Sequence, residues 1–134
     1  MLIVNLNGIV KSGLQKAGMF MQKETYMKQY MKKLGFMPYN GTLNVKLEND
    51  VEINIQEKYN EKLKIIKGDE NLGDVYFLEA TISTNDKKNS ETGAILFPTK
   101  TVHKIDTLEF VAKDKLREKM NLKDDSKVII SIQD

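Results

Sequence analysis

The chain has 134 residues, 21 of them basic and 19 acidic, which leaves a net charge of +2; it contains no cysteine. This length fits one domain, and the absence of cysteine excludes a disulfide scaffold and any zinc site built on thiolates. The balanced charge argues against binding to duplex nucleic acid, which usually requires a strongly basic face. His103 is the only histidine, which disfavours a histidine-rich metal site.

The N-terminal residues contain no basic stretch followed by a long apolar run, and no other apolar run reaches membrane-spanning length. We therefore expect neither a signal peptide nor a membrane span, and a soluble, cytoplasmic protein. The sequence contains no internal repeat, proline-rich linker or low-complexity tract. It predicts a single domain over residues 1–134, and we expect a monomer.

Residues 2–11 are rich in branched apolar side chains and predict a strand, followed by a glycine-containing loop over 12–18. Thr25 is a candidate N-cap of a helix that runs to Leu34, where Gly35 would end it. The apolar positions of this helix form one stripe at helical spacing, which we expect to lie in the core: Tyr26, Met27, Tyr30, Met31 and Leu34.

Residues 38–41 predict a turn, and residues 42–47 alternate as a strand does. Residues 51–69 predict one or two short strands, around 53–55 and 63–66. The pattern in 42–47 places Leu43, Val45 and Leu47 on one face, and Thr42, Asn44 and Lys46 on the other.

The second half of the chain predicts strands over 75–82, 93–97, 108–112 and 127–132, with a polar loop over 85–92. Asp114 is a candidate N-cap of a short helix that ends at Met120. Six to eight short strands with two helices favour a mainly β fold, a compact β-barrel with short inserted helices, over alternating βαβ units.

The sequence contains neither a GxxxxGK[ST] phosphate loop nor the protein-kinase signature set. Thr42 and Asn44 could still bind a cation, because two oxygen ligands at i and i+2 point from the same strand face. Such a pair suits Mg²⁺, which takes its other ligands from water and nucleotide phosphates. The alternative is that both residues simply belong to the polar outer face of a strand.

Three further features could carry chemistry, and each has a plainer explanation. The loop from Gly13 to Gly18 could cradle phosphates with its backbone N–H groups, or could be a simple hairpin connection. The segment after Asp114 could bind an anion at a helix start, or could be a solvated charged face. Glu109 could accept a proton from a substrate hydroxyl, whereas an exposed glutamate on a strand is also common.

Four segments, taken together and in this order, resemble the archaeal CTP-dependent riboflavin kinase family: GIVKSGLQKAGMF, LGFMPYNGTLNVKL, GAILFPTKTVH and KLREKMNLKDDSKVIISI. The resemblance runs from about Gly8 to Ile132, and residues 51–75 match little. It implies a six-stranded cradle-loop barrel. It also implies transfer of the terminal phosphate of CTP to riboflavin, which gives FMN and CDP.

The resemblance also implies roles for individual residues. Thr42 and Asn44 fall on the family's Mg²⁺ ligands, and Thr101 and Glu109 fall on its flavin-contacting positions. Few groups could take the hydroxyl proton, because His103 is the only imidazole, so Glu109 is also the predicted general base. The alternative is that Glu109 only binds the ribityl chain of the flavin and that no base is required. The predicted nucleotide-binding residues are Gly13, Leu14, Gln15, Lys16, Ala17, Gly18, Asp114, Lys115, Leu116 and Arg117.

The first loop departs from the family's GxGxG spacing, because Gln15 and Ala17 stand where glycines are expected and Met19 replaces an aromatic residue. An alternative function comes from the C-terminal tail, which also resembles the strand-helix-strand unit of swapped-hairpin transcription factors. Those proteins usually carry a concentrated basic face, which this chain lacks, so the sequence favours the kinase. A flavin-binding module without activity is a third possibility.

Overall fold

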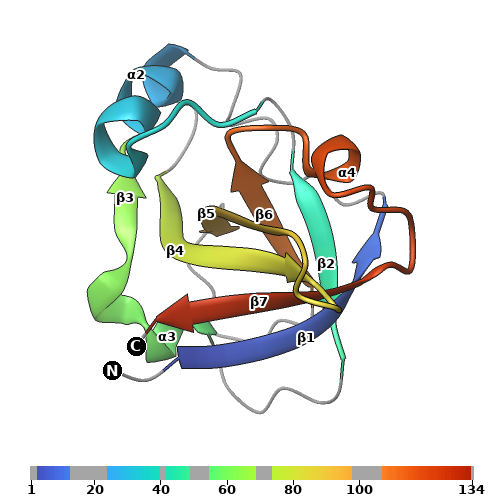
Figure 1. The fold of residues 1–134 in the computed structure, drawn as a ribbon. Helices are drawn as coiled ribbons and strands as arrows, with labels where there is room; N and C mark the ends of the chain where they lie inside the picture. Colours follow the sequence, from blue (N-terminus) through green and yellow to red (C-terminus); the bar gives the residue numbers. More distant parts are fainter. Residues whose placement is uncertain are drawn as a thin grey trace.

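The fold is described from a computed structural model, which covers residues 3–12, 24–39, 42–48, 55–68, 74–97 and 107–133. Its sheet has seven antiparallel strands in the order β3-β4-β5-β6-β2-β1-β7 (Figure 1). The strands are β1 (Ile3–Lys11), β2 (Leu43–Leu47), β3 (Lys64–Ile66), β4 (Val75–Thr84), β5 (Ser90–Phe97), β6 (Thr107–Ala112) and β7 (Lys127–Gln133).

The sheet closes on itself because β7 pairs with β1 along one edge and with the second half of β4 along the other. Six strands thus form a hydrogen-bonded ring, and β3 adds to the first half of β4 outside that ring. Closure removes most free strand edges. The predicted mainly β barrel is confirmed, including the six strands of its ring.

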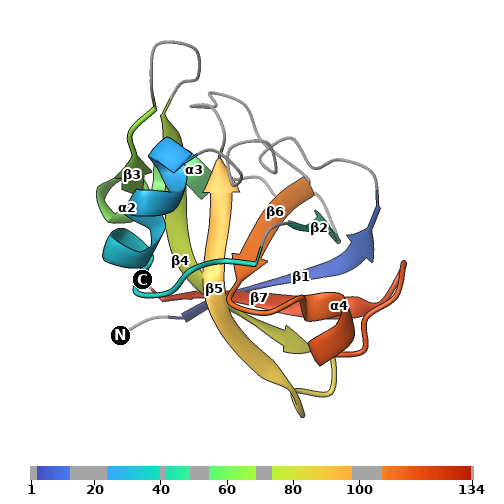
Figure 2. The ribbon, with the colours of Figure 1, turned by 90° about the horizontal axis from the view of Figure 1, so that it is seen from above.

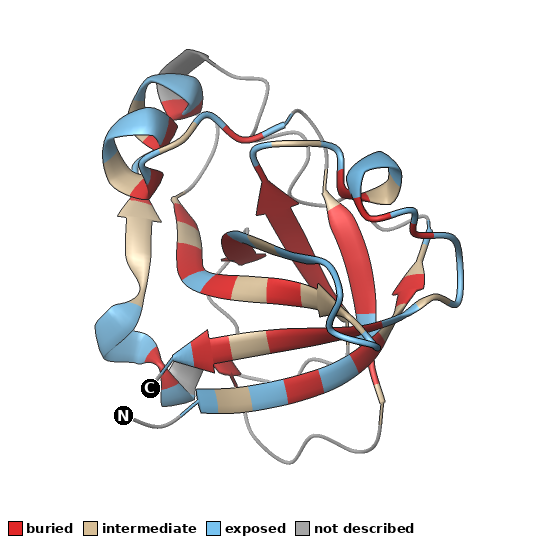
Figure 3. Cartoon of the chain, in the orientation of Figure 1, coloured by how far each residue is buried: buried red, intermediate tan, exposed pale blue. Residues whose placement is uncertain are grey.

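The interior of the ring is filled by side chains that alternate along each strand. Leu43, Val45 and Leu47 of β2 all point into this core, as the alternation in the sequence predicted. Buried and less buried residues alternate along β1 and β4 as well (Figure 3). The polar face of β2 therefore points away from the interior, which is where any site on Thr42 and Asn44 must lie.

Helix α2 (Glu24–Leu34) packs on the outside of the barrel, beside β3 and β4 (Figure 2). Tyr26, Tyr30 and Leu34 form a second core with outward-facing side chains of the sheet, and the Tyr30 ring meets the Phe77 ring edge-on at 5.4 Å between centroids. Burial is the main cause that raises the pKa of Tyr30 well above its ordinary value, and the neighbouring Tyr26 adds to it.

The prediction that the whole apolar stripe of α2 is core was wrong for two of its members. Met27 is 39% exposed and Met31 is 53% exposed. Both lie one position after the residues at i, i+4 and i+8 that face the sheet, so they project about 100° away from the contact. Gly35 ends the helix in the left-handed region, at φ +83°, as predicted.

Two other local expectations were also wrong. Thr25 lies inside α2 and is not its N-cap. Ile55 begins a helix, α3 (Ile55–Lys58), where a strand was expected around 53–55; residues 53 and 54 lie outside the described part. The helical spacing places Ile55 and Tyr59 on one side, so that both side chains fill the barrel interior. The short helix η1 (Asn60–Lys62) then leads into β3, close to the strand expected over 63–66.

The C-terminal helix, α4 (Leu116–Lys119), is shorter than the expected helix from Asp114 to Met120. Lys115 occupies the N-cap position and makes no capping side-chain bond. The carboxylate of Asp114, the predicted N-cap, instead accepts a hydrogen bond from Lys119 at 2.9 Å. Leu116 and Met120 are buried in the interior core. The predicted polar loop over 85–92 is also shorter, since β5 already begins at Ser90.

Candidate active site

Two polar residues of neighbouring strands face each other on the outside of the barrel. Asn44 of β2 lies directly opposite Glu109 of β6 in the antiparallel register, so both side chains project from the same face. Both are buried: Asn44 is 3% exposed and Glu109 is 7% exposed. Among the described residues these are the buried polar side chains, and buried polar groups need partners.

Thr42 completes this group of oxygens. It precedes β2 by one residue and shares the face of Asn44, two positions away. Its hydroxyl donates a hydrogen bond to the Oε1 atom of Glu109 at 3.1 Å, and the contact is partly buried. A residue predicted to bind metal is therefore bonded directly to the predicted general base, although 67 positions separate them.

The side-chain oxygen of Asn44 accepts no hydrogen bond from any described residue, although it is buried. Leaving a buried acceptor unsatisfied costs about 1–3 kcal/mol. Such an atom is a natural place for a ligand or ion to bind. Amide, hydroxyl and carboxylate oxygens are the donors that Mg²⁺ prefers, so the group formed by Thr42, Asn44 and Glu109 fits a hard cation.

The described residues hold no cluster of three or more His, Cys, Asp or Glu side chains that could bind a metal. A cation at Asn44 would therefore have few protein ligands. This is how Mg²⁺ commonly binds in nucleotide enzymes, with one or two protein groups and the rest from water and phosphates.

The row that contains Asn44 and Glu109 continues onto the strands on either side. Lys11 of β1 pairs with Asn44, and Leu96 of β5 pairs with Glu109. Leu96 belongs to the apolar cluster under α2, whereas the Lys11 ammonium bonds Asp125 at 2.6 Å. The three oxygens therefore lie between an apolar surface on one side and a charged one on the other.

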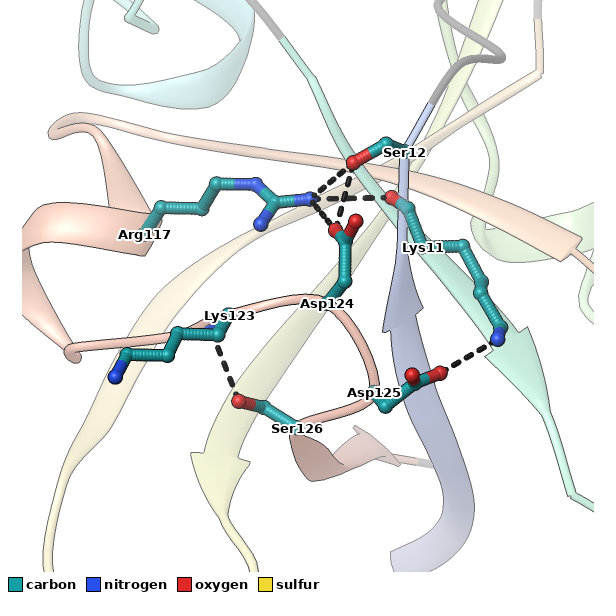
Figure 4. Close-up of polar contacts among 7 residues, drawn as sticks. All are labelled: Lys11, Ser12, Arg117, Lys123, Asp124, Asp125 and Ser126. Carbon is teal, nitrogen blue, oxygen red and sulfur yellow. Dashed lines mark hydrogen bonds and ion pairs between the residues drawn. The ribbon is translucent and has the colours of Figure 1, made fainter.

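The end of β1 is tied to the turn before β7 by a network around Arg117 (Figure 4). The Nη2 atom of Arg117 donates to Asp124 Oδ1 at 2.7 Å, to Ser12 Oγ at 3.0 Å and to Lys11 O at 3.4 Å. The Ser12 hydroxyl donates to the same Asp124 oxygen at 2.6 Å. This bond and the one from the Arg117 guanidinium hold the pKa of Asp124 below its ordinary value.

The other predicted residues of the segment 114–117 make contacts of a different kind. Lys119 links the Asp114 carboxylate, at 2.9 Å, to Glu91 of β5 at 3.1 Å, and its hydrogen bond to Asp114 lowers the pKa of that carboxyl group. Lys115 lies 3.8 Å from Glu118 in an exposed pair. These contacts attach α4 to the barrel, and nucleotide binding by 114–117 stays a prediction.

The structure does not describe several of the predicted positions. The loop from Gly13 to Gly18, Thr101 and His103 lie outside the described residues. The structure thus brings together Thr42, Asn44 and Glu109 and leaves the remaining assignments as predictions. The sequence reading missed the roles of Ser12 and Asp124, whose contacts join residues 112 positions apart and leave no local pattern.

A cavity of about 670 Å³ opens elsewhere, over β4, β5 and the end of β7. Its lining includes Leu34, Glu79 and Ser131 but none of Thr42, Asn44 and Glu109. The candidate site therefore lies outside this cavity. In the described part of the chain, no helix is both long enough and apolar enough to cross a membrane.

Comparison with known proteins gives one consistent result. The family model of CTP-dependent riboflavin kinases, which carries the description "domain of unknown function DUF120", matches residues 10–132. The chain belongs to this family. The resemblance predicted from the sequence is thereby confirmed, and the matched range contains every residue of the oxygen group and of the Arg117 network.

Individual members of the family are also similar over nearly their whole length. The riboflavin kinase of Methanosphaera stadtmanae is 56% identical over 131 residues, which is 98% of this chain and 99% of the relative. The riboflavin kinase of Methanobrevibacter smithii is 42% identical, over 95% and 98% of the two chains. That of Methanothermobacter thermautotrophicus is 37% identical, over 92% and 94%. Nothing in these comparisons supports the DNA-binding alternative.

Proposed function

We propose that this protein is a riboflavin kinase that transfers the terminal phosphate of CTP to the 5′-hydroxyl of riboflavin, giving FMN and CDP. Membership of the family and the similarity to riboflavin kinases of archaea support the reaction. The observation that carries the proposal is the group of Thr42 and the buried Asn44 and Glu109, which the pairing of β2 with β6 brings together on the outside of the barrel.

Asn44 and Thr42 would hold a Mg²⁺ ion that arrives with the nucleotide. The ion would neutralise phosphate charge as the transferred group leaves CDP. The unsatisfied oxygen of Asn44 supports this role, because only a ligand from outside the described residues can satisfy it. The hydroxyl of Thr42 donates a hydrogen bond to Glu109, so the lone pairs of the Thr42 oxygen stay available to a cation.

Glu109 would take the proton that riboflavin loses. The 5′-oxygen forms a bond to the terminal phosphorus, the bond from phosphorus to the bridging oxygen of CTP breaks, and the hydroxyl proton moves to the carboxylate. A base must lie within hydrogen-bond reach of that proton. The bond from Thr42 orients Glu109 beside the proposed Mg²⁺ ligands, so the base and the phosphate would share one small region.

The choice of CTP over ATP would come from residues 114–117, whose backbone groups would read the amine and carbonyl of the cytosine edge. A pocket built for those groups leaves its own polar groups unpaired when a purine enters. The family's name supports CTP as the donor. The phosphates would lie on the loop from Gly13 to Gly18.

The proposal is tested by incubating the protein with riboflavin, CTP and Mg²⁺ and following FMN by chromatography. FMN should form in step with CDP, and chelation of Mg²⁺ should stop both. Riboflavin that binds without FMN appearing under any nucleotide would show a flavin-binding module and not a kinase.

A further inference from the structure

We propose that Arg117 is a positioning residue for the nucleotide site: with Asp124 and Ser12 it fixes the end of β1, the strand beside β2, to the turn before β7. This inference rests on the proposed function, because the end of β1 leads in sequence into the residues predicted to bind the phosphates of CTP. It gives Arg117 a role different from direct contact with the nucleotide.

The network has the form of a closed triangle. Arg117 donates to both Ser12 and Asp124, and Ser12 in turn donates to the Asp124 oxygen that Arg117 contacts. The Ser12 hydroxyl thus accepts one bond and donates another, which fixes its orientation. Bonds between a guanidinium and a carboxylate are about twice as strong as neutral ones. One nitrogen of Arg117 therefore connects the end of β1 with the turn before β7, two segments more than 100 positions apart in sequence (Figure 4).

Backbone hydrogen bonds also join β1 to the turn before β7. The Val10 amide donates to the Ser126 carbonyl at 2.9 Å, and the Asp125 amide donates to the Val10 carbonyl at 2.8 Å. These bonds hold β1 beside the turn as far as Val10. The side chains of Arg117 and Asp124 extend that attachment to Lys11 and Ser12, the last described residues of this segment.

The position of Ser12 matters because of its neighbour on β2. Lys11 pairs with Asn44, so Ser12 follows at the level where β2 begins, next to the proposed Mg²⁺ ligands. A shift of the β1 end would move Lys11 and Ser12 relative to Asn44. Misplacement of about 1 Å can cost about 100-fold in rate, even when the changed residue lies away from the reacting atoms.

The test is the Michaelis constant for CTP, measured beside that for riboflavin. Arg117→Met should raise the KM for CTP by about tenfold or more and leave the KM for riboflavin nearly unchanged. Arg117→Lys keeps the charge and should restore part of the loss. Asp124→Asn and Ser12→Ala should also raise the KM for CTP, although both variants keep Arg117.

A double-mutant cycle gives the sharper result. If Arg117 acts through the network, Arg117→Met combined with Asp124→Asn should be hardly worse than Arg117→Met alone, because residues of one network are not additive. Asp125→Asn is the matched control: it removes the same charge from the same turn, but its partner is the exposed Lys11 ammonium. Its KM for CTP should equal that of the wild type, since exposed pairs contribute little.

Two outcomes would overturn the inference. If Asp124→Asn and Ser12→Ala leave the KM for CTP unchanged while Arg117→Met raises it, Arg117 contacts the nucleotide directly. If all the variants raise both Michaelis constants equally and lower the melting temperature, the network is only structural. Failure of the wild-type protein to make FMN from CTP is a separate result, which would refute the proposed function and, with it, the nucleotide site that Arg117 is proposed to position.

Discussion

Asn44 and Glu109 lie opposite each other on neighbouring strands, and both are buried on the outer face of a barrel whose interior is apolar. This arrangement does not help the protein to fold, because the unsatisfied amide oxygen of Asn44 lowers the free energy of unfolding. Residues that lower stability in this way are expected at functional sites. The pair therefore gives the account its most specific physical prediction.

Asn44→Leu should separate stability from activity. Without metal and nucleotide, the variant should be at least as stable as the wild type, because it removes the buried unsatisfied oxygen. Its kcat should fall by about 100-fold or more, as expected when a ligand of a catalytic ion is lost. Thermal unfolding of the free protein and the rate of FMN formation with Mg²⁺ measure the two effects.

Lys46→Met is the matched control for this substitution, since Lys46 shares the strand and face of Asn44 but is exposed. Its kcat should match that of the wild type. An Asn44→Leu protein that is fully active, or one that is inactive only because it has unfolded, would count against a ligand role for Asn44.

Thr42→Val should weaken the binding of the Mg²⁺ that activity requires. Valine has the shape of threonine but cannot donate to Glu109 or offer an oxygen to a cation. The Mg²⁺ concentration for half-maximal activity should rise by about 10- to 100-fold. Thr42→Ser keeps the hydroxyl and should restore most of the affinity; a Mg²⁺ titration identical for all three proteins would remove Thr42 from the site.

Glu109→Gln tests the general base, because glutamine keeps the shape and can still accept a hydrogen bond from Thr42 but has no charge. If Glu109 takes the proton, kcat should fall by about two orders of magnitude or more while riboflavin binds as before. Riboflavin binding is measured by fluorescence quenching. Unchanged turnover together with weaker riboflavin binding would assign Glu109 to the flavin site alone.

The raised pKa of Tyr30 predicts how the free energy of unfolding changes at alkaline pH. Its pKa is raised in the folded protein, so its contribution is complete below the unfolded value of about 10 and is lost as pH rises above it. Tyr30→Phe should therefore lose less stability than the wild type between neutral pH and pH of about 10–11. Denaturant unfolding at each pH measures this, with Tyr39→Phe, an exposed residue, as the control. Parallel pH curves for the wild type and Tyr30→Phe would contradict the assignment.

Much of the fold could be predicted from the sequence because alternation is a local signal. Leu43, Val45 and Leu47 identified both the strand β2 and its inward face. The helix at Ile55 was missed because a short apolar segment can be either a helix or a strand by its spacing. Its apolar side chains fill the barrel interior although the segment is not a strand of the sheet. The exposure of Met27 and Met31 depends on which side of α2 the sheet covers, which the local sequence pattern does not determine.

The candidate site, like the fold, could be predicted from the sequence only in part. Thr42 and Asn44 became candidates from their spacing on one strand and from the resemblance, and Glu109 became one from its residue type and from the resemblance. Their convergence follows from the pairing of β2 with β6, which joins positions more than 60 residues apart. The network of Arg117, Ser12 and Asp124 could not be found in this way, since each member reads as an ordinary polar residue of a loop or helix.

The most direct test of the account is a competition between nucleotides in one reaction. The protein is given riboflavin, Mg²⁺ and equal concentrations of CTP and ATP, and the ratio of CDP to ADP formed early in the reaction reports the ratio of the two kcat/KM values. We predict that CDP exceeds ADP by at least about 100-fold, because a site built to pair with the cytosine edge rejects a base that leaves its groups unpaired. Equal amounts of CDP and ADP, or ADP with FMN and no CDP, would contradict the account.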